Sequence, residues 1–318
     1  MATSSPRHVN RKRDGEVMIA LLGVTGAGKS TFASIASGKQ LEIGHGVKPY
    51  PLSVKFELDG RTVILIDTPG FDDDQRSDVQ ILEAIFKWMT RKGLLKNQLL
   101  DGLIFLHPVT LNRVGGAEQR RTRLFEKILG PKAYKRVIIA TTMWDDLKYE
   151  EVVRSRLNGR SGEGGVWHEL CSKGAVMRRH DNNIESAHKI IREVIATSDR
   201  YGKVKSLLES ELARNQGRVG KTSAGKELKA RLKEDIRLLR SQYDDLLRDP
   251  PPEPPRTHGG RHERKDEKWE AWSQWKDDMR GLDKMIQTKE FELEKVDTMV
   301  VSKKNTAAEP SENLWRPR

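Results

Sequence analysis

Short apolar runs alternate with longer helical patterns through the first half of the chain. Most of these runs are separated by segments long enough for crossover helices, such as 77–90 and 118–129. This alternation predicts an α/β fold in which helices cover a mostly parallel sheet. The six expected strands are Val17 to Leu22, Val54 to Leu58, Thr62 to Ile66, Gly102 to Leu106, Val137 to Ala140 and Ala175 to Met177.

One pair of apolar runs follows a different pattern. Asp59, Gly60 and Arg61 alone separate the second run from the third. An Asp-Gly pair between two strands is a strong signal for a tight hairpin, which joins antiparallel neighbours. We therefore expect one antiparallel edge strand.

The C-terminal part of the chain has a helical pattern and denser charges. Apolar side chains recur every three or four residues at Leu228, Leu232, Ile236, Leu239, Tyr243 and Leu246, which predicts an amphipathic helix suited to a helical partner. Prolines after Asp249 must end it. A second helical pattern carries Trp269, Trp272, Trp275, Met279, Leu282 and Ile286. The expected parts are a disordered basic arm (1–14), a packed domain (15–198), an amphipathic or coiled-coil helix (199–248), a Pro/Gly-rich linker (249–261), a charged helix (262–300) and a disordered tail (301–318).

Composition narrows the class of protein. The chain has 318 residues, a formal charge of +12 and one cysteine, Cys171. No stretch approaches the roughly 20 apolar residues of a membrane span, and the first residues lack the apolar core of a signal peptide. A single cysteine forms no internal disulfide. We expect a basic, cytoplasmic protein without a structural zinc site.

A glycine-rich motif follows the first expected strand. Residues 23–30 read GVTGAGKS, which matches the phosphate-loop pattern G-x-x-x-x-G-K-[ST] between a strand and a helix. In this motif backbone amides surround the phosphates, the lysine reaches the β- and γ-oxygens, and the hydroxyl binds Mg²⁺. The expected nucleotide-binding residues are Gly23, Thr25, Gly26, Ala27, Gly28, Lys29, Ser30 and Thr31.

The sequence DTPG follows the third expected strand. Asp67 at that strand end can hold Mg²⁺ together with Ser30, and the amide of Gly70 can contact the γ-phosphate. We expect Lys29 and Gly70 to act in catalysis. The alternative is that DTPG is an ordinary turn at the end of a strand and binds no ligand.

The fifth expected strand runs into TTMWD. Guanine-specific proteins carry [NT]-K-x-D at this place, and Thr142 to Asp145 fits that pattern except that Met143 replaces the lysine. A carboxylate at Asp145 can accept two hydrogen bonds from the guanine edge; the alternative is a structural aspartate that caps the next helix. His180, after the last strand, is the candidate for a second base contact.

These motifs resemble those of the septin-related immunity-associated GTPases, also called paraseptins. GVTGAGKST, DTPGFDD and the strand ending in TTMWD carry the likeness, which is closest to fungal G-domain proteins of that group through FLHPVTLNRVGG and HDNNIESAHKIIREVI. The resemblance covers roughly residues 15–198. It implies a P-loop GTPase fold, binding of GTP or GDP with Mg²⁺, and nucleotide-dependent self-association into homo-oligomers.

The chain departs from the family pattern at two positions. No threonine lies between Thr31 and Thr62, where the first switch normally supplies one, and Pro51 stands near its expected place. Phe71 follows DTPG where many small GTPases have a water-orienting glutamine. We expect a guanine-nucleotide switch with slow GTP hydrolysis. A non-hydrolysing, GTP-dependent assembly module and a P-loop ATPase remain alternatives.

Three further features stay open at this point. His107 and Arg113 flank a polar loop after the fourth strand, at the edge of the sheet where ligands bind. The tail tryptophans fit a packed helix, with peripheral membrane contact as an alternative. We expect no specific nucleic-acid binding, because no helix-turn-helix or RNA-binding signature is present.

Overall fold

The structure is a computed structural model that describes residues 15–41, 52–67, 77–80, 82–83, 100–111, 115–144, 150–204, 206–254 and 267–301. The described chain forms two compact units. The first contains residues 1–77 and 83–206, and the second contains residues 78–82 and 207–318.

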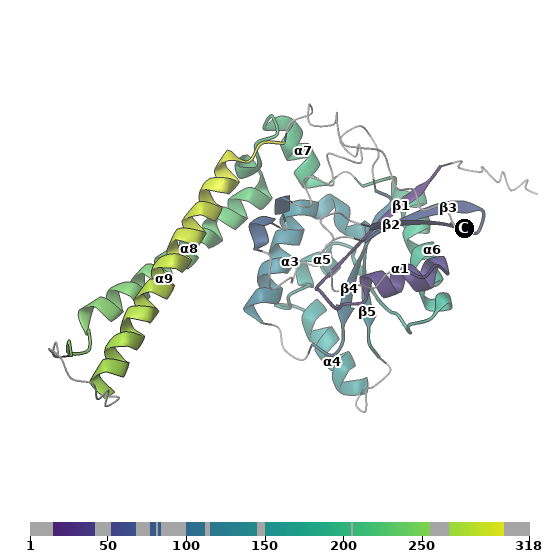
Figure 1. The fold of residues 1–318 in the computed structure, drawn as a ribbon. Helices are drawn as coiled ribbons and strands as arrows, with labels where there is room; N and C mark the ends of the chain where they lie inside the picture. The colour runs from purple at the N-terminus through teal and green to yellow at the C-terminus, as the bar shows by residue number, and fades with distance from the viewer. Residues whose placement is uncertain are drawn as a thin grey trace, which may run out of the picture. The chain divides into compact units, whose positions relative to one another are not determined.

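A six-stranded sheet forms the centre of the first unit (Figure 1). The strand order is β2-β3-β1-β4-β5-β6, and every neighbouring pair is parallel except β2 and β3. This arrangement confirms the expected P-loop GTPase fold class with one antiparallel edge strand. The strands are β1 (Val17–Gly23), β2 (Leu52–Leu58), β3 (Arg61–Asp67), β4 (Gly102–Pro108), β5 (Val137–Thr142) and β6 (Val176–Arg179).

The hairpin between β2 and β3 has the expected two-residue turn. Asp59 and Gly60 have φ angles of 50° and 75°, and Leu58 pairs with Arg61 directly across the turn. Positive φ at both central residues is the requirement of a type I′ turn, whose twist matches that of the flanking strands. The Asp-Gly signal therefore predicted both the turn and the antiparallel edge.

Helices cover both faces of the sheet, and the alternation of side chains along β4 separates the two faces. Ile104 and Leu106 belong to the core shared with helices α1 (Lys29–Ser37) and α6 (Ile184–Tyr201). Phe105 faces the opposite way, against Phe125 and Trp167. That second face carries α3 (Gly116–Leu129) and α5 (His168–Ser172) (Figure 1). The short 3-10 helix η2 (Pro131–Arg136) follows α3. Helix α4 (Glu150–Ser161) precedes α5.

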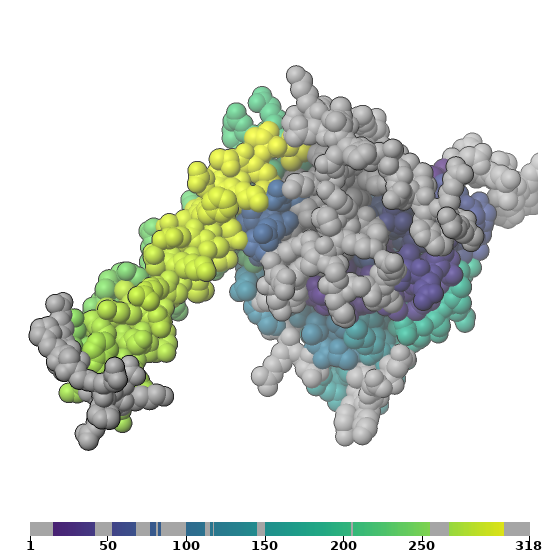
Figure 2. Space-filling model, in the orientation of Figure 1, coloured from purple at the N-terminus to yellow at the C-terminus, as the bar shows by residue number. Residues whose placement is uncertain are grey.

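The second unit is built around an antiparallel helical hairpin. Helix α8 (Ser223–Arg248) and helix α9 (Glu267–Thr298) lie side by side along their length in both views (Figures 1 and 2). Leu228, Leu232 and Ile236 of α8 are buried, as are Met279 and Val296 of α9. The amphipathic stripe of α8 therefore has its helical partner within the same chain.

The segment 199–248 contains more than one helix. It includes the end of α6, helix α7 (Leu207–Arg214), the 3-10 turn η3 (Val219–Lys221) and α8. Gly202 and Gly217 have positive φ values of 78°, a conformation that ends a helix at little cost for glycine. Thr222 then caps α8, because its hydroxyl accepts a hydrogen bond from the Gly225 amide.

Residues 78–82 group with the helical unit although they lie between β3 and β4 in the sequence. Arg231 of α8 forms an ion pair of 2.7 Å with Asp78, and Val79 and Leu82 are buried. The expected helix over 77–90 is described only at residues 77–80 and 82–83.

None of the helices in the described ranges has the length and apolar character needed to cross a bilayer.

Candidate nucleotide site

The phosphate loop connects the end of β1 to the start of α1. Gly23 has φ of 147°, and a Cβ atom there would lie 2.5 Å from the Leu106 carbonyl oxygen of β4. Gly26 and Gly28 have φ values of 77° and 90°, which side chains rarely allow. These three glycines let the chain turn sharply against the sheet. The first amides of α1 are thus placed where a helix binds phosphate.

Lys29 is the first residue of α1 and its side chain is buried. Its Nζ donates hydrogen bonds to the carbonyl oxygens of Gly23 at 3.1 Å and Val24 at 2.9 Å. Burial lowers the pKa of Lys29, and the nearby charge of Asp67 partly opposes this effect. The ammonium therefore lies folded along the loop, held by neutral acceptors that a charged phosphate oxygen can replace with a stronger hydrogen bond.

Ser30 and Asp67 lie together, as the two motifs predict. The Ser30 hydroxyl donates a 2.6 Å hydrogen bond to Asp67 Oδ2. Asp67 Oδ1 is buried and has no hydrogen-bond partner among the described residues. Burial raises the pKa of Asp67, against the lowering effects of the Ser30 hydrogen bond and the Lys29 charge.

This pair fits a divalent cation with oxygen ligands. Mg²⁺ is usually held by one or two protein oxygens and completes its shell with water and substrate phosphates. A buried carboxylate oxygen without a partner costs free energy that a cation would offset. Ser30 and Asp67 are therefore suitable for Mg²⁺, and the described residues contain no larger cluster of His, Cys, Asp or Glu that could hold a metal.

The end of β5 is fastened to the phosphate loop. The Thr142 hydroxyl donates a 3.0 Å hydrogen bond to the Ala27 carbonyl oxygen. Met143 follows with φ of 64° and is 41% exposed, whereas Trp144 is buried and its indole N–H donates to the Thr141 carbonyl oxygen. The chain thus leaves β5 beside the phosphate loop. Asp145, the expected guanine contact, lies just beyond the described residues.

His180 follows β6 at the same edge of the sheet. Its ring is 3% exposed, lies edge-on to Phe32 of α1 at 4.9 Å between ring centres, and has Nδ1 2.8 Å from the Ser186 hydroxyl. Its backbone amide donates to the Thr141 carbonyl oxygen. These contacts join the loop before α6 to β5 and α1. A direct contact between His180 and a base stays a prediction.

Several other expected site residues fall outside the described ranges. They are Gly70, with the adjacent Phe71, Pro51 in the first switch and Arg113 after β4. Ser53, the serine that follows Pro51 by two positions, lies in β2 opposite Ile66 of β3 and is exposed.

The phosphate loop and Asp67 lie in a part of the chain that matches a known protein family. Residues 17–161 match the AIG1 family. The AIG1-like segment runs from β1 to α4 and includes the phosphate loop and Asp67. This match supports the resemblance to P-loop GTPases; the septin-related and fungal parts of that resemblance stay predictions.

Solved structures with a similar fold have low sequence identity. Toc33 from Arabidopsis thaliana in complex with GDP and Mg²⁺ is 18% identical, with a TM-score of 0.47, over 59% of this chain and 86% of Toc33. The G domain of the T. maritima FeoB iron transporter is 20% identical, with a TM-score of 0.36, over 58% of this chain and 99% of that domain. Among curated proteins, none matches the chain significantly.

A buried polar cluster within the AIG1-like segment was not predicted. His107 is 2% exposed, and burial, followed by the charge of Arg160, lowers its pKa to about 3. Arg160 of α4 donates to Glu118 at 3.2 Å and to the Leu111 carbonyl oxygen at 2.9 Å, and its guanidinium lies over Trp167. The cluster holds both ends of the connection between β4 and α3. His107 is therefore a neutral packing residue of that connection.

Proposed function

We propose that this protein is a Mg²⁺-dependent guanine-nucleotide-binding protein that hydrolyses GTP slowly. The observation that carries the proposal is the convergence of Lys29, Ser30 and Asp67 at the end of the phosphate loop, where one buried carboxylate oxygen of Asp67 has no hydrogen-bond partner among the described residues. A glycine-rich turn without a ligand would have no reason to bury an ammonium and a carboxylate together. The AIG1 match over residues 17–161 supports the same activity.

The chain's own residues would bind and orient the phosphates. Loop amides and Lys29 would hold the β- and γ-oxygens, with Ser30 and Asp67 holding the cation directly or through water. Bound Mg²⁺ supplies positive charge that offsets the charge of the β- and γ-phosphates. Gly70 would donate its amide to the γ-phosphate while water attacks in line. The phenylalanine at 71 has no polar group to orient that water, so intrinsic hydrolysis should be slow.

Guanine recognition is assigned to Asp145. Its support is positional, because Thr142 fastens the end of β5 to the phosphate loop and Asp145 follows three residues later. Replacing Asp145 with Asn puts a donor where the base edge needs an acceptor, a mismatch that costs on the order of 1–3 kcal/mol. The substitution should weaken GTP binding selectively. Equal discrimination between GTP and ATP before and after it would refute the assignment.

Nucleotide-dependent self-association, in the cytoplasm, is the finer part of the proposal. The α8 stripe is buried against α9, so an assembly surface would have to lie elsewhere or require the hairpin to open. The missing switch threonine favours the second candidate function, a GTP-dependent assembly module without turnover. Light scattering with GDP and with a non-hydrolysable GTP analogue tests the association, and single-turnover hydrolysis separates the two candidates.

The decisive experiment measures nucleotide binding by the full chain. Fluorescently labelled GTP and ATP are titrated with Mg²⁺ and with EDTA. We expect GTP to bind more tightly than ATP, and EDTA to weaken GTP binding at least tenfold. Saturable binding of neither nucleotide, or equal affinity with Mg²⁺ and with EDTA, would overturn the proposal.

A further inference from the structure

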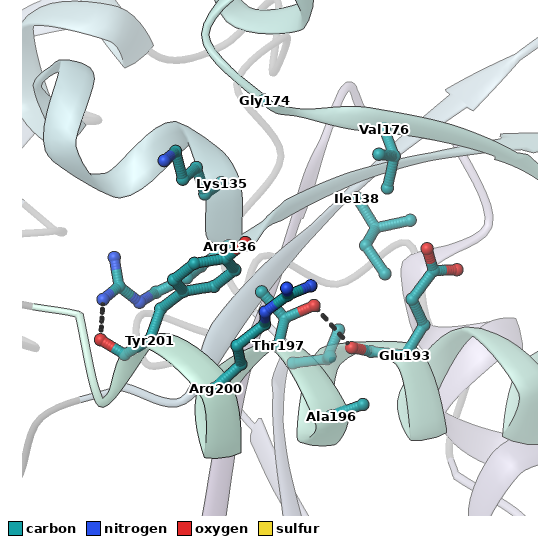
Figure 3. Close-up of a pocket in the computed structure, with 11 residues that line it drawn as sticks. Lys135, Arg136, Ile138, Gly174, Val176, Glu193, Ala196, Thr197, Arg200 and Tyr201 are labelled. Atoms are coloured by element: carbon teal, nitrogen blue, oxygen red, sulfur yellow. Dashed lines mark hydrogen bonds between the residues drawn. The ribbon is translucent and has the colours of Figure 1, made fainter.

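A second cavity lies at the opposite end of the sheet from the phosphate loop. It has a volume of about 350 Å³ and lies between the starts of β5 and β6, the end of η2 and the last turns of α6 (Figure 3). The phosphate loop follows the carboxyl end of β1, whereas this cavity adjoins the amino ends of β5 and β6, and all three strands run parallel. The cavity is therefore separate from the nucleotide site.

The cavity has an apolar floor. Ile138 of β5 and Val194 of α6 are buried, and Val176 of the edge strand β6 is half-buried. Its volume falls within the range of small-molecule sites, which are mostly apolar with a few placed polar groups. An apolar body about the size of a phenyl ring can therefore be covered on this floor.

The rim of the cavity is cationic and ordered by an aromatic ring. Lys135 Nζ lies 5.3 Å from the centre of the Tyr201 ring, and the Arg200 guanidinium carbon lies 5.5 Å from it. In Figure 3 the ring lies between the two side chains. Cation–π contacts of this kind restrain long side chains that are otherwise free at a surface.

These two cations keep their charge available. Neither Lys135 nor Arg200 forms an ion pair with any described carboxylate. Glu193, the acidic residue of the lining, is already held by Arg178 through two hydrogen bonds of 2.7 and 2.6 Å. The lining therefore carries an excess of positive charge.

Arg136, a third cation of the lining, reduces the repulsion that carbonyl oxygens would exert on a bound anion. The C-terminal end of α6 points carbonyl oxygens toward this region, which would repel negative charge. Arg136 donates to the carbonyl oxygen of Tyr201 (Figure 3). It also donates to the carbonyl oxygens of Gly202 and, at 3.0 Å, of Lys132. Each of its three guanidinium nitrogens donates to one of these backbone acceptors. The carbonyl ends are thereby neutralised and the rim cations remain for a ligand.

We propose that this cavity binds a carboxylate with an apolar or aromatic body. The apolar body would lie on Ile138 and Val176. The carboxylate would accept a forked hydrogen bond from Arg200, supported by the charge of Lys135. The carboxylate belongs either to a free small molecule or to the C-terminal residue of a peptide, since both present the same chemistry.

The test measures binding of defined probes to the full chain by ligand-observed NMR. The free-acid probe is 3-phenylpropionate, with its amide as the neutral counterpart. The peptide probe is acetyl-Gly-Gly-Phe with a free carboxylate, again with its C-terminal amide as counterpart. We expect a Kd on the order of 1 mM or tighter for at least one acid, typical of a ligand of this size. Each amide should bind at least tenfold more weakly.

Variants connect the binding to the rim. Arg200→Gln and Lys135→Gln change exposed side chains and should each weaken acid binding at least fivefold. Lys132→Gln removes an exposed cation of η2 that does not line the cavity and should leave binding unchanged. Tighter binding of the peptide than of the free acid would assign a peptide terminus, and the reverse a small molecule.

Three results would overturn the proposal. They are no saturable binding of either acid, equal binding of acid and amide, or unchanged binding in Arg200→Gln. GTP binding should be the same in all these variants, because the cavity is separate from the phosphate loop. Its measurement also shows that each variant is folded, and keeps the outcome independent of the nucleotide proposal.

Discussion

Ser30 and Asp67 are joined by a hydrogen bond of 2.6 Å across 37 positions of the sequence. This contact connects the first turn of α1 to the end of β3, which pairs with β1. It leaves Asp67 with one satisfied oxygen and one buried oxygen that has no hydrogen-bond partner in the part of the chain that the structure describes. Among the described residues, the site therefore has a carboxylate oxygen that a bound cation can contact.

Replacing Asp67 with Asn should preserve the stability of the ligand-free protein but remove the effect of Mg²⁺ on GTP binding. The pKa of Asp67 is raised by burial, so its contribution to stability is present below the ordinary value of 3.8 and is lost as the pH rises through the folded-state pKa. At neutral pH the ligand-free variant should unfold at an equal or higher temperature than the wild type. Mg²⁺ should no longer tighten its GTP binding.

The control for this prediction is Asp59→Asn. Asp59 is an exposed aspartate in the β2–β3 turn, and its hydrogen bonds to Arg192 lower its pKa. This variant should keep the Mg²⁺ dependence of the wild type. A large loss of thermal stability in Asp67→Asn, together with intact Mg²⁺ dependence, would contradict the assigned metal role.

Lys29→Ala should abolish nucleotide binding without unfolding the protein. The ammonium is the phosphate loop's own side-chain cation, and loss of a charged hydrogen bond to phosphate costs about 1.5–3 kcal/mol per bond. GTP affinity should fall at least 100-fold by calorimetry. The ligand-free variant should be no less stable, because burial already disfavours the charged lysine.

Lys39→Ala serves as the matched control for Lys29. Lys39 follows α1, is exposed, and donates to the Lys55 carbonyl oxygen. We expect wild-type affinity in this variant. Wild-type GTP affinity in Lys29→Ala would show that the phosphate loop does not bind the nucleotide.

Glu126 of α3 should make stability depend on pH near neutrality. Burial, followed by the charge of Glu169, raises its pKa to about 7. Its contribution to stability is present below the ordinary value of 4.5 and is lost as the pH rises through about 7. Glu126→Gln should therefore be more stable than the wild type above pH 7, by about 1 kcal/mol after allowing for solvent around this half-buried group.

Urea denaturation at pH 5.5 and pH 8 measures this effect. The difference between Glu126→Gln and the wild type should be larger at pH 8. Glu151→Gln, which changes an exposed glutamate of α4, should show no such difference. Equal shifts at both pH values in Glu126→Gln would exclude titration of Glu126 as the cause.

The helical hairpin offers a matched pair of leucines. Leu232 of α8 is 3% exposed and Leu238 on the same helix is 47% exposed. Leu232→Asp puts a charge at a buried position of the helix that pairs with α9 and should destabilise the hairpin by about 3 kcal/mol or more, whereas Leu238→Asp should be nearly neutral. Hydrogen exchange of the α9 amides reports the difference.

GTP binding should survive both leucine substitutions, because the phosphate loop belongs to the other compact unit. Wild-type protection of α9 in Leu232→Asp would contradict the pairing of the two stripes. Loss of GTP binding in Leu238→Asp would show that the helical unit affects the nucleotide site through its surface.

Much of the fold was accessible from the sequence because its signals are local. All six apolar runs are strands, and the Asp59–Gly60 turn predicted the one antiparallel pair. The bounds of helix α4 were not predicted, because most of its residues are polar or charged and it buries only Val153, Leu157 and Arg160. The pairing of α8 with α9 was also missed. Each stripe is visible in the sequence, but the partner of a stripe depends on contacts between distant residues.

The candidate nucleotide site and its surroundings also contain residues that the sequence predicts and residues that only the packing reveals. Residues within a motif, such as Lys29 and Ser30, are predictable because the spacing itself makes the phosphate loop. Arg160 carries no comparable signal, since a charged residue in a charged helix usually faces solvent and only the packing against Trp167 buries it. The sequence places His107 only at the border of a polar loop, and the structure shows that it is a buried residue of β4.

The helical unit is discontinuous in sequence, because it includes residues 78–82 as well as everything after Ser206. A truncation after residue 206 would therefore not remove a whole folding unit. It would leave Asp78 without Arg231 and remove helices from the unit that contains the buried side chains of Val79 and Leu82. Aggregation of such a fragment would reflect a cut through a packed unit, and activity lost with it could not be assigned to the tail alone.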